Sequence, residues 1–159
     1  MNVAIGAAAA HTSSGGQYVK RLKTSSMPRE LRDWYIDEAL KGALNHETRF
    51  HRRDDLRRYL FVSCFGLVHK RSPKLSDFPV HLLPKHENVW AARESHELFD
   101  DRFRTQIPLE PAMTVTSHIA KDGHSFIHHD ASQCRSWTVR EAARAQSFPD
   151  NYFFEGTRT

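Results

Sequence analysis

The sequence predicts a small mixed α+β domain built from short helices, a β-hairpin and a capped helix. Three observations support this fold class: apolar residues at helical spacing over 54–66, β-branched residues ahead of an Asp-Gly pair at 122–123, and a capping box at residue 138. Apolar residues repeat about every 3.6 positions in a helix and every second position in a half-buried strand, which separates the two. With 159 residues, the chain can bury the core of an ordinary domain.

Composition places the chain among globular proteins. Hydrophobic residues make up 39% and charged residues 26% of the chain, and no apolar run approaches the roughly 20 residues of a membrane helix, so we expect no membrane partner. The formal net charge of +4 is compatible with a polyanionic partner. Two cysteines are too few for a secreted disulfide scaffold and indicate a reducing compartment such as the cytoplasm.

The first two segments are a basic lead-in and a short helix. Residues 1–28 contain lysine and arginine but no acid, and we expect them to be flexible. They lack the basic flank of a secretory signal at their start. Beyond Pro28, which suits a first helical turn, Leu31, Trp34 and Tyr35 have helical spacing and predict an amphipathic helix to about Leu44.

The clearest helix is predicted over 54–66, with two acids in its first turn and Gly66 near its end. Its apolar stripe consists of Leu56, Tyr59, Leu60 and Cys64. Because Phe61 and Phe65 widen the stripe, we expect burial on more than one side and a buried, inert Cys64 thiol.

An irregular but ordered loop is predicted next, because prolines at 73, 79 and 84 exclude a long helix or a central strand. The expected anchors of this loop are Leu75, Phe78, Leu82 and Leu83. A second, polar helix is predicted over 85–100.

The segment 113–128, MTVTSHIAKDGHSFIH, predicts a β-hairpin with Asp122 and Gly123 at its turn, since both positions favour positive φ. Four histidines accompany it, at 118, 124, 128 and 129, and they could in principle bind zinc. Alternation along a strand points neighbouring side chains apart. We therefore expect no metal site and instead a polar edge that meets phosphate or solvent.

A capped helix is predicted from Val139, because Thr138 and Glu141 have capping-box spacing, and Pro149 ends it near Ser147. Arg140 and Arg144, four residues apart, would share an exposed cationic face. Two readings stay open for these arginines: contact with phosphates, or ion pairs with Glu141 or Asp150 that tie the domain together.

The stretch 135–156, RSWTVREAARAQSFPDNYFFEG, resembles the ninth sequence motif of DNA (cytosine-5) methyltransferases. The matching residues are Arg135, Thr138, Arg140, Glu141, Ala143, Arg144, Gln146, Phe148, Pro149 and Asp150. Segments 111–136, 72–86 and 43–61 are similar to the region that precedes this motif in a bacterial-type branch, with falling specificity toward the N-terminus, so the resemblance covers about 34–159.

The resemblance implies a role in methyl transfer from S-adenosylmethionine to carbon 5 of a cytosine flipped out of double-stranded DNA. In the family a cysteine thiolate in a Pro-Cys motif adds to carbon 6. The ninth motif is mostly organisational there, which implies structural roles for Arg135, Thr138, Glu141, Gln146, Phe148, Pro149 and Asp150. The DNA-contact candidates are Thr116, His118, Lys121, Arg140 and Arg144.

Several family features do not match. Cys64 follows a serine and Cys134 a glutamine, so we expect no catalytic residue in this chain. The triplet 87–89, Glu-Asn-Val, lies on the wrong side of the recognition region to be the catalytic one. Gly15-Gly16 lacks the strand and helix of a cofactor loop, so we expect no S-adenosylmethionine site. The tenth motif, with its Asn-Ala-Val-Pro-Pro, would follow Thr159.

The sequence thus predicts a partial methyltransferase that is inactive alone, a piece of the α/β architecture without its Rossmann-like core, whose catalytic half would come from elsewhere. The predicted regions are the lead-in 1–28, a recognition-like part 29–106, and the hairpin with the ninth-motif helix 107–159. The implied location is the bacterial cytoplasm, at the nucleoid. The alternative is a stand-alone, non-catalytic DNA-binding module.

Overall fold

The computed structural model describes residues 27–37, 39–40, 42–85, 89, 100–121 and 123–156. The chain divides into two compact units: a first unit of Met1–Arg49 with Trp137–Thr159, and a second unit of Phe50–Ser136. The predicted lead-in falls almost wholly outside the described residues, and so does most of the predicted helix at 85–100. The predicted region boundaries at 28 and 106 stay predictions.

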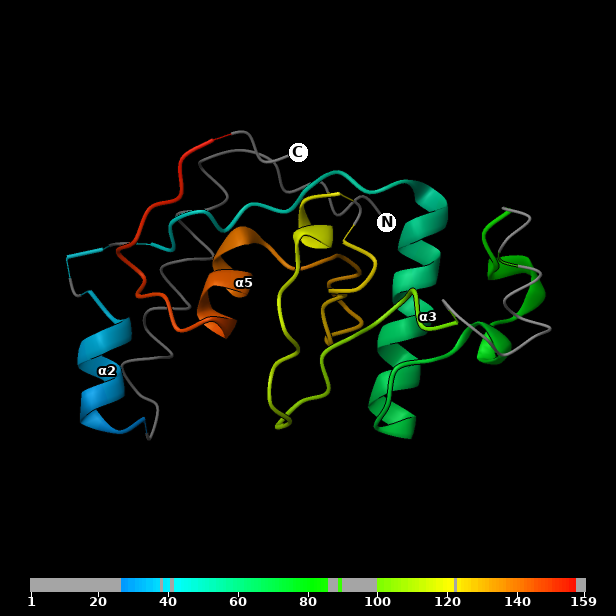
Figure 1. Cartoon of the computed structure of the whole chain (residues 1–159), viewed down its shortest axis with the longest axis horizontal. Coiled ribbons are helices and arrows are strands. Elements are labelled where there is room, and N and C mark those ends of the chain that lie inside the picture. Colours follow the sequence, from blue (N-terminus) through cyan, green and yellow to red (C-terminus); the bar gives the residue numbers. More distant parts are fainter. Residues whose placement is uncertain are drawn as a thin grey trace. The chain divides into compact units, whose positions relative to one another are not determined.

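Helix α3, Arg53–His69, is the main element of the second unit (Figure 1) and confirms the predicted helix, three residues longer at its end. Asp54 and Asp55 stand in its first turn, where carboxylates favour the positive end of the helix dipole. Lys70 ends the helix in a left-handed conformation, φ 55°, and its N–H bonds the Gly66 carbonyl at 3.0 Å. Gly66 therefore lies one turn inside the helix.

The buried face of α3 differs from the predicted stripe. It consists of Tyr59, Val62, Ser63 and Gly66. Leu60 is 46% exposed and Cys64 is also exposed, so the expected burial of the Cys64 thiol is wrong. The reason is close approach at Gly66, where a Cβ atom would lie only 2.5 Å from Thr105 Cγ2. The smallest residues turn inward and the neighbouring apolar ones turn outward.

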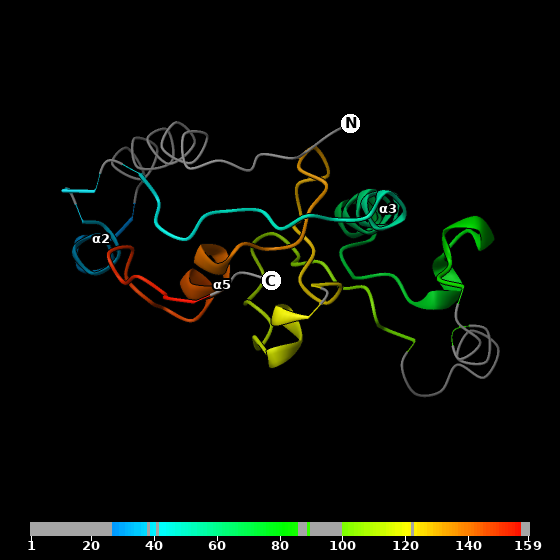
Figure 2. The ribbon, with the colours of Figure 1, turned by 90° about the horizontal axis from the view of Figure 1, so that it is seen from above.

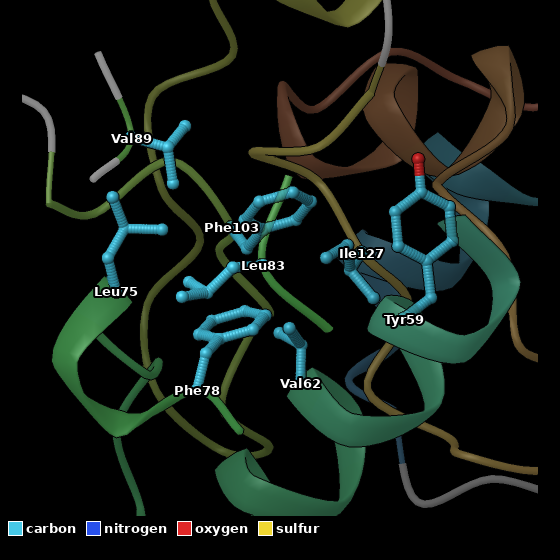
Figure 3. Close-up of a cluster of buried hydrophobic side chains, with 8 residues drawn as sticks. All are labelled: Tyr59, Val62, Leu75, Phe78, Leu83, Val89, Phe103 and Ile127. Carbon is cyan, nitrogen blue, oxygen red and sulfur yellow. The ribbon is translucent and has the colours of Figure 1, made fainter. Parts of the chain in front are cut away.

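The hydrophobic core of the second unit lies between α3 and the loops that follow it (Figure 3). It contains Tyr59, Val62, Leu75, Phe78, Leu83, Val89, Phe103 and Ile127. Two 3-10 helices, η1 at Leu75–Asp77 and η2 at Val80–Leu82, shape the proline-rich loop. Three of the four predicted loop anchors are buried, and the fourth, Leu82, packs against the cluster.

A bidentate ion pair fixes the start of this loop. Arg71 Nη1 and Nη2 donate to the two carboxylate oxygens of Asp77 at 2.8 and 3.1 Å, and Asp77 also accepts from the Lys74 N–H at 2.8 Å. The hydrogen bond from Arg71 is the main reason that the pKa of Asp77 lies below its ordinary value. The ion pair thus ties the residue before the loop, Arg71, to the last residue of η1, Asp77.

The predicted hairpin is wrong. Ser117–Ala120 form a 3-10 helix, η3, and the described residues contain only isolated bridges, Thr105 with Ile127 and Ile127 with Ser136. Ile127 forms its bridges with Thr105 and Ser136, and in the part of the chain that the structure describes no bridge joins 114–116 to 126–128 across the turn. Positive φ is present at the turn, with Gly123 at 73°. The positive φ expected at Gly123 is thus confirmed, Asp122 lies outside the described residues, and the expected strand pairing is wrong.

The first unit contains α2, Arg29–Tyr35, and α5, Val139–Ala145 (Figures 1 and 2). Helix α2 begins after Pro28 as predicted but ends at Tyr35, well before Leu44, because Ile36 is extended. None of its residues is buried. No helix of the described residues combines the length and apolar character needed to cross a membrane.

Candidate functional site

The capping box at the start of α5 is confirmed. The Thr138 hydroxyl accepts from the Glu141 N–H at 3.2 Å, and the Glu141 carboxylate accepts from the Thr138 N–H at 2.8 Å. His46 Nδ1 lies 3.0 Å from the same hydroxyl. These contacts fix the first turn of α5 and place Arg140 at its second position.

Arg140 is buried, with 2% of its surface exposed, so the predicted exposed cationic face is wrong for this residue. Its guanidinium donates to the carbonyls of Leu44 and Pro149, each at 2.8 Å, and to that of Tyr152. The Phe154 ring lies 5.9 Å from its central carbon. A buried charge is tolerable only when it is hydrogen-bonded, and Arg140 in this way joins α5 to the remote Leu44 and to the 149–152 segment that follows the helix.

Asn45 completes this arrangement, which we call the arginine cage (Asn45, Arg140 and the carbonyls of Leu44, Pro149 and Tyr152). The Asn45 side chain exchanges two hydrogen bonds with the Phe154 backbone, at 2.9 and 3.0 Å, and its carbonyl accepts from the Arg140 N–H at 3.1 Å. Its φ of 57° is a conformation that asparagine tolerates better than most residues. No local sequence pattern marks Asn45.

Arg144 forms the ion pair that one of the two sequence readings expected. Its Nε donates to Asp150 Oδ1 at 2.7 Å, and its guanidinium lies 4.8 Å from the centre of the Tyr35 ring. The Asp150 N–H bonds the Tyr35 carbonyl at 3.0 Å. The end of α5 is thereby tied to α2, and the 148–156 run passes beside that helix in Figures 1 and 2.

The aromatic run after α5 forms a small cluster. Phe148 packs its ring 5.1 Å from Tyr152 and 5.2 Å from Phe154. Pro149 supplies a carbonyl to the arginine cage, while Gln146 caps α5 through its backbone and keeps an exposed side chain. Tyr152 and Phe153 are each about half exposed.

Arg135, the first residue of the motif, is buried in the second unit. Its Nε donates to Gln133 Oε1 at 2.9 Å and its Nη1 to the Ser136 carbonyl at 3.0 Å. The Ser136 N–H donates to His51 Nε2 at 3.2 Å. The Arg135 guanidinium, like that of Arg140, thus bonds a backbone carbonyl.

The remaining DNA-contact candidates are exposed. Thr116, His118 and Lys121 flank or belong to η3 rather than a hairpin edge. Arg144 is half-buried in its ion pair and Arg140 is enclosed. The structure therefore brings Arg140 and Arg144 into a bracing network and leaves the other three candidates on the surface of the second unit.

The histidines play several parts. His124 Nδ1 lies 2.8 Å from the Tyr59 hydroxyl, a partly buried polar contact that sequence reasoning missed. His128 and His129 stack, with ring centroids 4.7 Å apart, instead of pointing apart as expected from strand alternation. Within the described ranges, no three His, Cys, Asp or Glu side chains gather as a metal site.

The two cysteines are free and differ in environment. Cys134 Sγ donates to the Leu56 carbonyl at 3.0 Å, and burial raises the pKa of its thiol. Cys64 is the exposed thiol. A partly buried thiol with a raised pKa is a poor nucleophile at neutral pH.

Comparison with curated proteins finds type II methyltransferases. The chain is 42% identical over 118 residues to Type II methyltransferase M.Bpa9945I of Bacillus paralicheniformis, a match that covers 74% of this chain and 24% of that protein. It is 48% identical over 48 residues to M.AgeI of Thalassovita gelatinovora, covering 30% and 11%. It is 38% identical over 65 residues to M.DdeI of Desulfomicrobium norvegicum, covering 41% and 14%.

These relatives support a methyltransferase relationship, and the chain spans about a quarter or less of the length of each. No family model matches the chain, and no solved structure matches it. The methyltransferase relationship therefore rests on curated relatives.

Proposed function

We propose that this chain is part of a DNA methyltransferase, and that it supplies the end of the recognition region together with the brace that holds it. The arginine cage carries the proposal. It accounts physically for the stretch that resembles the ninth motif, since Arg140 of that stretch bonds backbone at three separate places. The relatives are named type II methyltransferases, which supports assigning the chain to a methyltransferase.

The finer parts of the proposal come from the resemblance. The methylated atom is carbon 5 of cytosine, the partner is double-stranded DNA in the bacterial cytoplasm, and S-adenosylmethionine is the cofactor of the whole enzyme. The described residues offer no fit for that cofactor, because they contain no glycine-rich turn between a strand and a helix. The chain alone transfers no methyl group, since neither cysteine stands in a Pro-Cys motif.

A domain exchange tests this function. The matched 118-residue segment of M.Bpa9945I is replaced by the corresponding segment of this chain, and the chimera is assayed with labelled S-adenosylmethionine and duplex DNA. We expect methyl transfer by the chimera and none by the relative with that segment deleted. Mass spectrometry of the digested nucleosides then identifies the product, which we expect to be 5-methylcytosine.

The result that would overturn the proposal is a folded chimera without methyl transfer. A different methylated base would reject the cytosine-5 assignment alone. Duplex binding by the isolated chain distinguishes the partial methyltransferase from the stand-alone DNA-binding module. If the isolated chain binds duplex DNA while the chimera shows no methyl transfer, the stand-alone module is favoured.

A further inference from the structure

An open cavity of about 510 Å³ lies in the second unit between the first turns of α3 and the η2 segment. Helix α3 packs against η2 at this place. The lining residues are Asp54, Arg57, Arg58, His81, Leu82, Leu83 and Lys85. Two arginines, one lysine and one histidine thus line the cavity together with a single carboxylate, that of Asp54.

Arg58 is the fixed wall of this cavity. Its Nε donates to the Leu82 carbonyl at 2.7 Å and its Nη1 to Asp55 Oδ1 at 2.8 Å, and its side chain is largely buried. These bonds hold α3 and η2 at a constant separation. The charge of Arg58 is balanced by Asp55, so its contribution is mainly to keep the cavity open.

Arg57, His81 and Lys85 are the exposed hydrogen-bond donors of the cavity lining. Arg57 meets Asp54 at 3.7 Å, with both side chains about two-thirds exposed, and such pairs contribute only about 0 to 1 kcal/mol. Within the described ranges, His81 and Lys85 have neither a hydrogen bond nor an ion pair, and both are exposed. An incoming anion therefore displaces at most one weak ion pair.

We propose that this cavity binds a phosphodiester group of the DNA backbone. Phosphate oxygens accept hydrogen bonds from guanidinium, ammonium and imidazole N–H groups, which are the groups present here. The cavity is open, so a continuous polyanionic strand reaches it. The inference rests on the proposed function and adds a contact that sequence reasoning did not assign, because none of Thr116, His118, Lys121, Arg140 and Arg144 lines the cavity.

Asp54 gives the proposal a directional consequence. Its carboxylate would repel a phosphate bound in the same cavity, and it forms a weak ion pair with Arg57. The substitution Asp54→Asn removes that opposing charge, so we expect duplex binding to tighten several-fold. A gain of binding cannot arise from partial unfolding, which separates this variant from variants that only lose binding.

The test measures binding of the purified full chain to a fluorescent duplex by anisotropy, over a range of potassium chloride concentrations. In the double variant Arg57→Gln and Lys85→Gln we expect weaker binding and a salt slope smaller by about 2, because each lost phosphate contact lowers it by about 0.9. The matched control, Arg29→Gln with Lys70→Gln, removes equal charge outside the cavity. We expect its slope to stay within about 0.5 of the unmodified chain. Circular dichroism checks that each variant folds.

Equal slopes for the cavity variant and its control, with the unmodified chain still binding DNA, would overturn the cavity proposal and leave the proposed function standing. No duplex binding by the unmodified chain would also overturn the cavity proposal, whereas the proposed function is decided separately by methyl transfer in the chimera. Titration with inorganic phosphate alone, followed by NMR of the Arg57 and Lys85 resonances, distinguishes a free-phosphate site. If those resonances shift with phosphate but not with duplex, the backbone assignment is rejected.

Discussion

Arg140 illustrates how one side chain can organise the backbone around it. Its guanidinium donates hydrogen bonds to the backbone carbonyls of Leu44, Pro149 and Tyr152. Substitution by methionine keeps much of the volume and removes every donor. We expect a loss of about 3 kcal/mol or more, because each stranded carbonyl costs about 1 to 3 kcal/mol. Urea unfolding followed by tryptophan fluorescence measures it, with Trp34 and Trp137 as reporters in the first unit.

Two companion variants separate lost hydrogen bonds from lost charge. Arg140→Lys retains the charge but offers one ammonium in place of a planar fork, so we expect it to recover only part of the stability. Arg29→Met removes an exposed arginine whose ion pair with Asp33, at 3.6 Å, is itself exposed, and should change the midpoint little. Equal midpoints for Arg140→Met and Arg29→Met would refute the structural role of the cage.

The two thiols should react at different rates. Cys64 is exposed, while Cys134 donates to the Leu56 carbonyl and has a pKa raised mainly by burial. Since the thiolate is the reactive form, iodoacetamide at pH 8 should modify Cys64 several-fold faster than Cys134. Peptide mass mapping over time measures both rates, and 6 M guanidinium chloride should equalise them. Similar rates in the folded chain would contradict the assigned environments.

At the scale of the element, Gly66 sets how closely α3 packs. Alanine normally stabilises a helix interior by about 1 kcal/mol relative to glycine. Here the added methyl would lie 2.5 Å from Thr105 Cγ2, and Thr105 is held by a 3.0 Å hydrogen bond from its hydroxyl to the Ile127 carbonyl. We therefore expect Gly66→Ala to destabilise the second unit by about 1 to 3 kcal/mol.

Thermal unfolding by circular dichroism at 222 nm measures this change. The matched control is Cys64→Ala, two positions earlier on the exposed side of α3, which should change the melting temperature by only a degree or two, because surface substitutions stay within about 0.5 kcal/mol. A Gly66→Ala chain as stable as the control would mean that the segment at Thr105 yields to the methyl group without cost.

Elements with local signals could be predicted from the sequence. Helix α3 has acids at its start and an uninterrupted helical run, and α5 has a capping box and a proline stop, so both follow from nearby residues. The hairpin prediction failed because the bridge partners of Ile127 are Thr105 and Ser136, and nothing in the Asp-Gly turn encodes them. The inward face of α3 depends likewise on Thr105 approaching Gly66.

The candidate site divides in the same way. The ion pair between Arg144 and Asp150 lies within six residues and was one of the two expected readings. The cage around Arg140 depends on Leu44 and Asn45, about 95 residues earlier in the sequence, and no spacing rule reaches that far. The phosphate-binding cavity joins the start of α3 to a proline-rich loop, which again is a tertiary juxtaposition.

At the scale of the whole molecule, the two units are stabilised by different means. The second unit buries a cluster of aromatic and branched side chains (Figure 3). Its hydrophobic contribution comes from large apolar areas removed from water. Among the described residues of the first unit, the buried groups are mainly polar or small: Asn45, Thr138, Arg140, Asp150, Ala142 and Ala143, with Trp137 as the large apolar member.

The net stabilisation by a hydrogen bond is smaller than that from burying a large apolar side chain. The free energy of local unfolding should therefore be lower for the first unit than for the second. Native-state hydrogen exchange with mass spectrometry tests this: we expect the amides of α5 to exchange before those of α3. The core variant Phe78→Ala, which should cost about 3 to 5 kcal/mol, should lower protection in α3 while leaving α5 unchanged. Protection of α5 that matched α3, or fell with it in the Phe78→Ala chain, would show one cooperative unit instead of two.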